Sequence, residues 1–199
     1  MLNIYLLRHG ETSYNADGNR YCGRTDIGLT LKGRQQAEAV RQQLQSISFD
    51  AVYSSPLERA YYTACITSGS DQVTKDARLI ELDFGLWEGK TREEFIAEDP
   101  EIWAGWVLNP ELTRAGQTGE NAAEVVFRVA DFFQEILGKY RHGNVLVVAH
   151  NGINRLYLAA QLGMPLANYR RIVQENSAVT LFSLSGEGEF SLKLLNSKI

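Results

Sequence analysis

The feature that most constrains the fold is the unbroken apolar run Val145–Ala149, which follows a Gly143-Asn144 turn. A short run of this kind, rich in β-branched residues, predicts a strand that is buried on both faces. Such strands belong to parallel sheets that helices cover on both sides. Strand-like and helix-like segments also alternate along the chain. We therefore expect an α/β fold, a three-layer α/β/α sandwich with a mostly parallel central sheet.

Other short segments have the apolar, β-favouring composition of strands. They are Leu2–Leu7, Ala51–Tyr53, Ala178–Ser183 and Phe190–Leu194. The last two flank a turn around Gly186-Glu187-Gly188, which indicates a hairpin at the end of the sheet.

Helical signals fill the intervals between these strands. Thr30 is a candidate N-cap for a helix to about Gln45, with apolar positions at Leu31, Ala37, Val40 and Leu44. Pro56 suits the first turn of a second helix, which we expect to run to about Thr67. The clearest helix spans Gly119–Tyr140, with an apolar face of Ala123, Val126, Phe127, Val129, Ala130, Phe133 and Leu137. A further helix is expected from His150 through Leu162, ended by Gly163.

Composition limits the function classes. The 199 residues carry 44% hydrophobic and 22% charged side chains and a net charge of −4, which is typical of a globular chain with a core of its own. We expect a single domain over residues 1–199. The acidic balance argues against nucleic-acid binding. No apolar stretch approaches the length of a membrane span. The chain has only two cysteines, Cys22 and Cys65, and they form no CxxC pair. We therefore expect a cytoplasmic protein.

The chain has only three histidines, and two of them follow predicted strands directly. His9 ends the first strand and His150 ends the central one. Ligands of such sheets bind beyond the carboxyl ends of the strands, so these two imidazoles are expected to meet there. His142 precedes Gly143 at a helix end, and we expect it to be solvated or to cap the helix.

Three further charged residues point to phosphate chemistry. Arg8 precedes His9, and its planar guanidinium would match phosphate oxygens beside an imidazole nucleophile. Arg59 falls one turn into the predicted second helix, where it can point into a pocket above the sheet. Glu81 lies among Leu, Ile, Phe and Trp, where burial would favour the protonated form that a general acid needs. Each of these residues alone is weak evidence for a phosphate site, and Glu81 could equally lie on the surface.

Together these residues form a pattern that resembles the histidine phosphatase superfamily, also called the phosphoglycerate mutase-like family, over nearly the whole chain. The Arg8–Thr12 segment, Arg-His-Gly-Glu-Thr after a strand, is similar to the hallmark of the family. Further similar blocks are Leu29–Ala37, Tyr53–Ala60 and Phe84–Gly89.

The resemblance implies a role for each matching residue. His9 would become phosphohistidine, and Arg8, Arg59 and His150 would stabilise the transferring phosphoryl group. Glu81 would protonate the leaving oxygen and then activate water. Neither a metal nor any other cofactor would be required. Candidate substrate-binding residues are Asn15, Cys22, Gly23 and Asn151, where the last stands in a His-Asn-Gly sequence in place of the His-Gly of many relatives. Cys22 could instead be a buried small residue.

The segment from about residue 91 to residue 118 is expected to form a small helical lid, with short helices near Thr91–Ala97 and Glu101–Val107. Trp103, Trp106 and Arg114 are candidates for substrate contact, although tryptophans more often form a core. Relatives that catalyse the mutase reaction usually carry a longer insertion between the positions of Glu81 and the second histidine. The segment is compact here, which favours hydrolysis.

The sequence therefore predicts a metal-independent phosphomonoesterase. The alternatives are a cofactor-dependent phosphoglycerate mutase and a catalytically inactive regulator that binds a phospholigand. The expected partner is a small phosphomonoester, such as a sugar phosphate, phosphoserine, phosphoglycerate or α-ribazole phosphate. Membrane and nucleic-acid partners are not expected, and a homodimer through an edge strand is left open. The Arg170-Arg171 pair suits either an anionic ligand or a solvated helix end.

Overall fold

A computed structural model describes residues 1–198 as one six-stranded sheet between two layers of helices. The strands are β1 (Leu2–Arg8), β2 (Ala51–Ser54), β3 (Thr74–Lys75), β4 (Gly143–Ala149), β5 (Val179–Leu184) and β6 (Phe190–Ser197). Their order in the sheet is β3-β2-β4-β1-β5-β6. The first four in this order are parallel to one another, and β5 pairs antiparallel with both of its neighbours, β1 and β6. The three-layer, mostly parallel sandwich expected from the sequence is confirmed.

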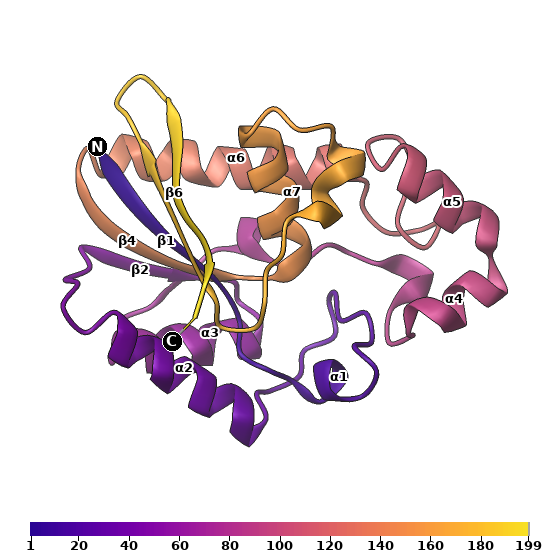
Figure 1. Cartoon of the computed structure of the whole chain (residues 1–199), viewed down its shortest axis with the longest axis horizontal. Helices are drawn as coiled ribbons and strands as arrows, with labels where there is room; N and C mark the ends of the chain where they lie inside the picture. The colour runs from indigo at the N-terminus through magenta and orange to yellow at the C-terminus, as the bar shows by residue number, and fades with distance from the viewer. Residues whose placement is uncertain (199) are drawn as a thin grey trace.

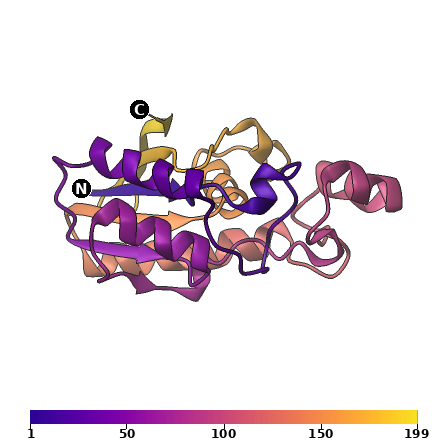
Figure 2. The same ribbon diagram turned by 90° about the horizontal axis from the view of Figure 1, so that it is seen from below.

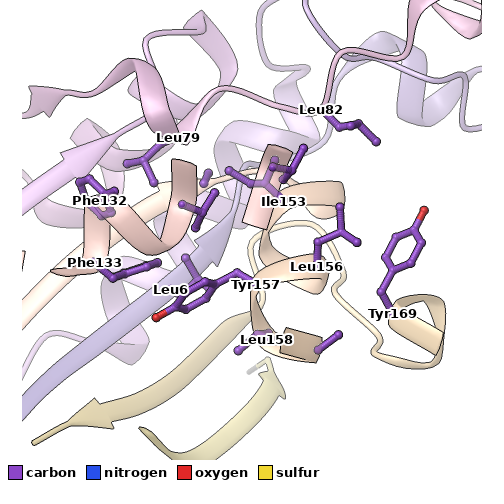
Figure 3. Close-up of a cluster of buried hydrophobic side chains, with 14 of the residues drawn as sticks. Leu6, Leu79, Leu82, Phe132, Phe133, Ile153, Leu156, Tyr157, Leu158 and Tyr169 are labelled. Atoms are coloured by element: carbon purple, nitrogen blue, oxygen red, sulfur yellow. The ribbon is translucent and has the colours of Figure 1, made fainter. Parts of the chain in front are cut away.

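The helices divide between the two faces of the sheet. Helices α2 (Leu31–Gln43) and α3 (Glu58–Ser68) cover one face, and α6 (Ala122–Lys139) and α7 (Asn151–Gln161) cover the other (Figure 1). Alternate residues of β1 follow this division. Tyr5 and Leu7 pack toward α2 and α3, whereas Leu2, Ile4 and Leu6 belong to the larger core under α6 and α7. In Figure 3, Leu6, Phe133 and Tyr157 lie together between the strand and these helices.

Two short helices lie beyond the carboxyl ends of the strands. They are α4 (Arg92–Glu98) and α5 (Pro100–Leu108), and both views show them at one end of the molecule (Figures 1 and 2). An aromatic cluster holds them there. The Trp87 ring stacks on Phe95 at 4.7 Å and contacts Trp103 and Trp106 edge-on. The remaining short elements are α1 (Ser13–Ala16), η1 (Ala77–Leu79), η2 (Gly85–Trp87) and η3 (Leu166–Arg171).

Several details differ from the sequence prediction. Phe127 and Leu31 are 77% and 74% exposed, so neither belongs to an apolar face. The buried face of α6 is instead Ala122, Val125, Val129, Phe132, Phe133 and Ile136, which pack against the sheet. Pro56 precedes the N-cap of α3, Leu57, and therefore lies outside the helix. Strand β3 was not predicted, since its two residues are polar.

No helix within residues 1–198 combines the length and the apolar character needed to cross a membrane.

Candidate active site

The candidate site is a cavity of about 390 Å³ beyond the carboxyl ends of β1 and β4. His9 follows β1 and lies in its wall, largely buried. The Nδ1 atom of His9 lies 2.7 Å from the carbonyl oxygen of Gly10. A carbonyl can only accept, so Nδ1 carries the proton and Nε2 keeps its lone pair. In the neutral imidazole, Nε2 is therefore the nitrogen available as a nucleophile.

His150 directly follows β4 and forms the N-cap position of α7. Its ring lies against His9, with ring centroids 5.2 Å apart. His150 is fully buried, and neither of its ring nitrogens has a hydrogen-bond partner within residues 1–198. The third histidine, His142, is exposed, as expected.

Arg8 and Arg59 are both buried beside this pair of rings. Arg8 donates from Nη1 to the carbonyl oxygen of Gln174 at 2.9 Å. Arg59 donates to the carbonyl oxygens of Thr25 and Gly23, each at 2.8 Å. The Nε atoms of both arginines are buried without a partner in the described chain. Within residues 1–198, backbone oxygens hold the two guanidiniums and no carboxylate forms an ion pair with them, so their positive charge is available to a ligand.

These charges shift the titration of the imidazoles. Burial first, then Arg59 and Arg8, hold the pKa of His9 well below its usual value. Burial and Arg59 lower the pKa of His150 in the same way. Burial also lowers the pKa of Arg8 to about 10. At neutral pH both histidines are therefore uncharged while Arg8 stays positive.

Glu81 brings a buried carboxyl group to the cavity wall. Its Oε2 accepts from the Gly152 N–H at 3.0 Å, and its Oε1 accepts from the Ile153 and Leu82 N–H groups at 3.1 and 2.8 Å. The carboxyl therefore sits on the first turn of α7. Glu81 is buried, which decides between the two positions that the sequence left open. Burial raises the pKa of Glu81, against the opposing effect of the Gly152 hydrogen bond.

Of the four residues predicted to bind substrate, three line the cavity: Asn15, Cys22 and Asn151. Burial raises the pKa of the Cys22 thiol to about 11, so the side chain stays uncharged. Gly23 does not line the cavity. Its carbonyl accepts from Arg59 and its N–H donates to Glu88 at 2.9 Å, which places it behind the wall.

Of the two alternatives given for the lid tryptophans, substrate contact and a core, the structure shows the core. Trp106 is buried in the aromatic cluster and donates to the Tyr169 hydroxyl at 3.2 Å. Arg114 pairs with Glu124 at 2.8 Å. None of Trp103, Trp106 and Arg114 lines the cavity, because the tryptophans form the core of this subdomain.

Other residues line the cavity without having been singled out for it. They include Tyr21, Phe84, Arg92, Arg155 and Tyr169. Arg170, one of the pair that the sequence offered for an anionic ligand, also lines the cavity, whereas Arg171 does not. For Arg155 the sequence held a usable signal, since it lies four residues after Asn151 on the same helix. Among residues 1–198, no group of three or more His, Cys, Asp and Glu side chains could hold a metal ion.

Comparison with known proteins agrees with this geometry. The sequence model of the histidine phosphatase superfamily (branch 1) matches residues 4–198. Phosphoserine phosphatase 1 of Hydrogenobacter thermophilus is 33% identical over 98% of this chain and 92% of its own length. Adenosylcobalamin/alpha-ribazole phosphatase of Escherichia coli is 34% identical over 82% and 81% of the two chains. The crystal structure of Entamoeba histolytica phosphoserine phosphatase with 3-phosphoglyceric acid superimposes with a TM-score of 0.90, at 30% identity, covering 100% and 98%.

The chain belongs to the histidine phosphatase superfamily. Within it the chain is a phosphoric monoester hydrolase, and neither the mutase nor the inactive regulator is favoured.

Proposed function

We propose that the chain hydrolyses small phosphomonoesters in two steps, with His9 as the phosphoryl acceptor. The observation that carries this proposal is the neutral, Nδ1-protonated His9 between two arginines whose charge no carboxylate cancels. In the first step Nε2 attacks phosphorus and the bond to the ester oxygen breaks. Glu81 gives its proton to the departing oxygen, which leaves as the alcohol.

In the second step a water oxygen attacks the phosphorus of phosphohistidine. Glu81, now a carboxylate, takes the proton of that water, the N–P bond breaks, and inorganic phosphate leaves. The buried Arg8 and Arg59 offset the charge that develops on the phosphoryl oxygens in both steps. His150 packs beside His9 as a neutral donor to the same oxygens. The cationic surroundings suit a phosphate dianion and disfavour a metal cation, so the proposed reaction requires no metal or other cofactor.

The supporting residues have narrower roles in this proposal. Asn15 and Asn151 contact the bound phosphate from the cavity wall, and Cys22 borders the leaving group. Gly23 acts indirectly, because its carbonyl fixes the guanidinium of Arg59.

We also propose a single domain over residues 1–199, with residues 91–118 as a lid over the cavity, since Arg92 and Glu93 line it.

The free thiols of Cys22 and Cys65 suit a cytoplasmic location, which cell fractionation tests. The net charge of −4 speaks against a nucleic-acid partner. A homodimer would use the edge strand β6, and size-exclusion chromatography tests it.

The test is hydrolysis of a panel of phosphomonoesters, with EDTA present, by the wild type and by His9→Ala. We expect wild-type turnover and a loss of at least about 10³-fold in the variant, as for removal of a nucleophile. His142→Ala is the matched control, because this histidine is exposed and distant from the cavity wall. Acid-quenched protein should carry phosphate on His9. Undiminished turnover by His9→Ala would refute the proposal.

A further inference from the structure

Two arginines on the cavity wall have no part in the phosphoryl transfer. Arg155 extends from α7 and Arg170 from η3, and both are partly buried. Neither takes part in any ion pair with a carboxylate within residues 1–198. Two other arginines of the same wall do have such partners: Arg20 pairs with Asp17 and Glu94, and Arg92 with Glu93. Apart from Arg8 at the phosphoryl end, the lining arginines without a carboxylate partner in the described chain are therefore Arg155 and Arg170.

Neutral groups hold these two guanidiniums in place. Arg170 donates to the hydroxyls of Tyr21 at 2.9 Å and Tyr169 at 3.2 Å, and it lies 4.3 Å from the ring centroid of Trp103. Arg155 donates from Nε to the Tyr169 carbonyl oxygen at 3.3 Å. Both terminal nitrogens of Arg155 lack an acceptor within the described chain, so they remain available to a ligand.

Two like charges next to each other in a partly buried wall oppose each other. Burial lowers the pKa of Arg155, and the nearby charge of Arg170 adds to this effect. An anion placed between the two guanidiniums would relieve this repulsion and accept hydrogen bonds from a planar donor fork. Arg8 and Arg59 already serve the phosphoryl group, so the second pair of arginines is suited to a second anion.

Helix α7 connects the phosphoryl end of the cavity to Arg155. Asn151 lies at the phosphoryl end of the cavity, beside His150, and Arg155 follows it by one turn of α7. Residues four apart on a helix lie on the same face, with Cβ atoms roughly 5–6 Å apart. Asn151 and Arg155 can therefore contact the two ends of one small ligand, whose two anionic groups are joined by a short carbon chain.

We infer that Arg155 and Arg170 form a second anion subsite, which selects phosphomonoesters that carry another acidic group a short carbon chain away from the phosphate. The inference rests on the proposed function, because it assigns the substrate class of the same cavity. The second anion is a carboxylate or a second phosphate, since a guanidinium fork matches either one.

Three esters that share one carbon skeleton test the subsite. Glycerol 3-phosphate has a neutral end, 3-phosphoglycerate has a carboxylate there, and glycerol 1,3-bisphosphate has a second phosphate. We expect kcat/KM for at least one of the two acids to exceed that for the neutral ester by about tenfold or more, the effect of one charge-assisted hydrogen bond. The preferred acid identifies the second anion. Equal values for all three esters would overturn the inference.

Variants connect that preference to the two arginines. Arg155→Gln and Arg170→Gln should each reduce the ratio of acid to neutral kcat/KM toward one, and Arg155→Lys should restore part of it. Arg171→Gln is the matched control, because Arg171 is exposed and does not line the cavity. A ratio that stays unchanged in both Gln variants counts against the subsite.

A binding measurement separates this inference from the proposed function. Titration calorimetry with His9→Ala, which should not turn over, should show tighter binding of the preferred acid than of glycerol 3-phosphate. This preference should decrease in His9→Ala/Arg155→Gln. If the wild type hydrolyses no ester, including p-nitrophenyl phosphate, the proposed function fails, and the calorimetry still decides the subsite. If it hydrolyses all esters equally, only the subsite fails.

Discussion

The carboxyl group of Glu81 lies on the first turn of α7, where its Oε2 accepts from the N–H of Gly152 at 3.0 Å. This contact joins a residue of an irregular segment to the helix that begins at the end of the central strand. It requires glycine at position 152, because a Cβ there would lie 2.7 Å from Glu81 Oε1.

Gly152→Ala should therefore displace the Glu81 carboxyl and weaken its role as the acid. We expect kcat for alkyl phosphates to fall by about 10²-fold, the lower range for loss of a general acid, and that for p-nitrophenyl phosphate to fall much less. Steady-state kinetics with both esters measure the difference. Gly138→Ala is the control, since nothing lies within 4 Å of its added Cβ. Equal losses for both esters would contradict the assigned role.

The pH dependence of kcat/KM should be bell-shaped. His9 must be neutral to attack, and its pKa is lowered by burial and by Arg59, so activity should persist below the usual histidine pKa before it falls. Glu81 must be protonated to act as the acid, and its pKa is raised by burial, so activity should fall as pH rises through that value. Glu81→Gln should lack the alkaline limb when p-nitrophenyl phosphate is the substrate. An unchanged alkaline limb in this variant would assign it to another group.

Arg128 should act as a positioning residue for Glu81. It donates from Nη1 to the carbonyl oxygens of Arg78 and Ile80, at 2.6 and 2.7 Å, and pairs with Glu120. Arg128→Met would leave these oxygens without a donor, which costs about 1–3 kcal/mol in free energy of unfolding. Urea denaturation measures that loss.

The catalytic effect of Arg128→Met should resemble that of Glu81 variants. We expect a larger loss of kcat for poor leaving groups than for good ones, together with a shifted alkaline limb. The control is Arg114→Met, whose exposed ion pair with Glu124 should contribute no more than about 1 kcal/mol. A loss of stability without any change in leaving-group dependence would limit Arg128 to a structural role.

Metal removal should leave turnover unchanged. Activity measured after dialysis against EDTA should equal that of untreated protein, because the positive charge opposite the phosphoryl group comes from arginines. Restoration of lost activity by an added divalent cation would contradict the proposed chemistry.

Local patterns in the sequence were enough to predict most of the elements. The apolar run Val145–Ala149 predicted β4, and Thr30 correctly marked the start of α2, because its side chain accepts from Gly33 N–H. The errors arose where periodicity alone was weak. On α6 several apolar residues lie outside the buried stripe, and only packing against the sheet shows that Phe127 faces solvent.

The sequence by itself determined that a histidine follows each of two strands, β1 and β4, at the same edge of the sheet, because the carboxyl ends of parallel strands meet at one edge. That β1 and β4 are neighbours was decided by the tertiary structure. Only the tertiary structure decided what surrounds the two histidines. Gly23 lies behind the wall and holds Arg59, whereas Arg155 and Arg170 come from separate elements and reach the cavity together. Such contacts join residues far apart in the chain, so their geometry depends on the packing of whole elements and leaves no local pattern to read.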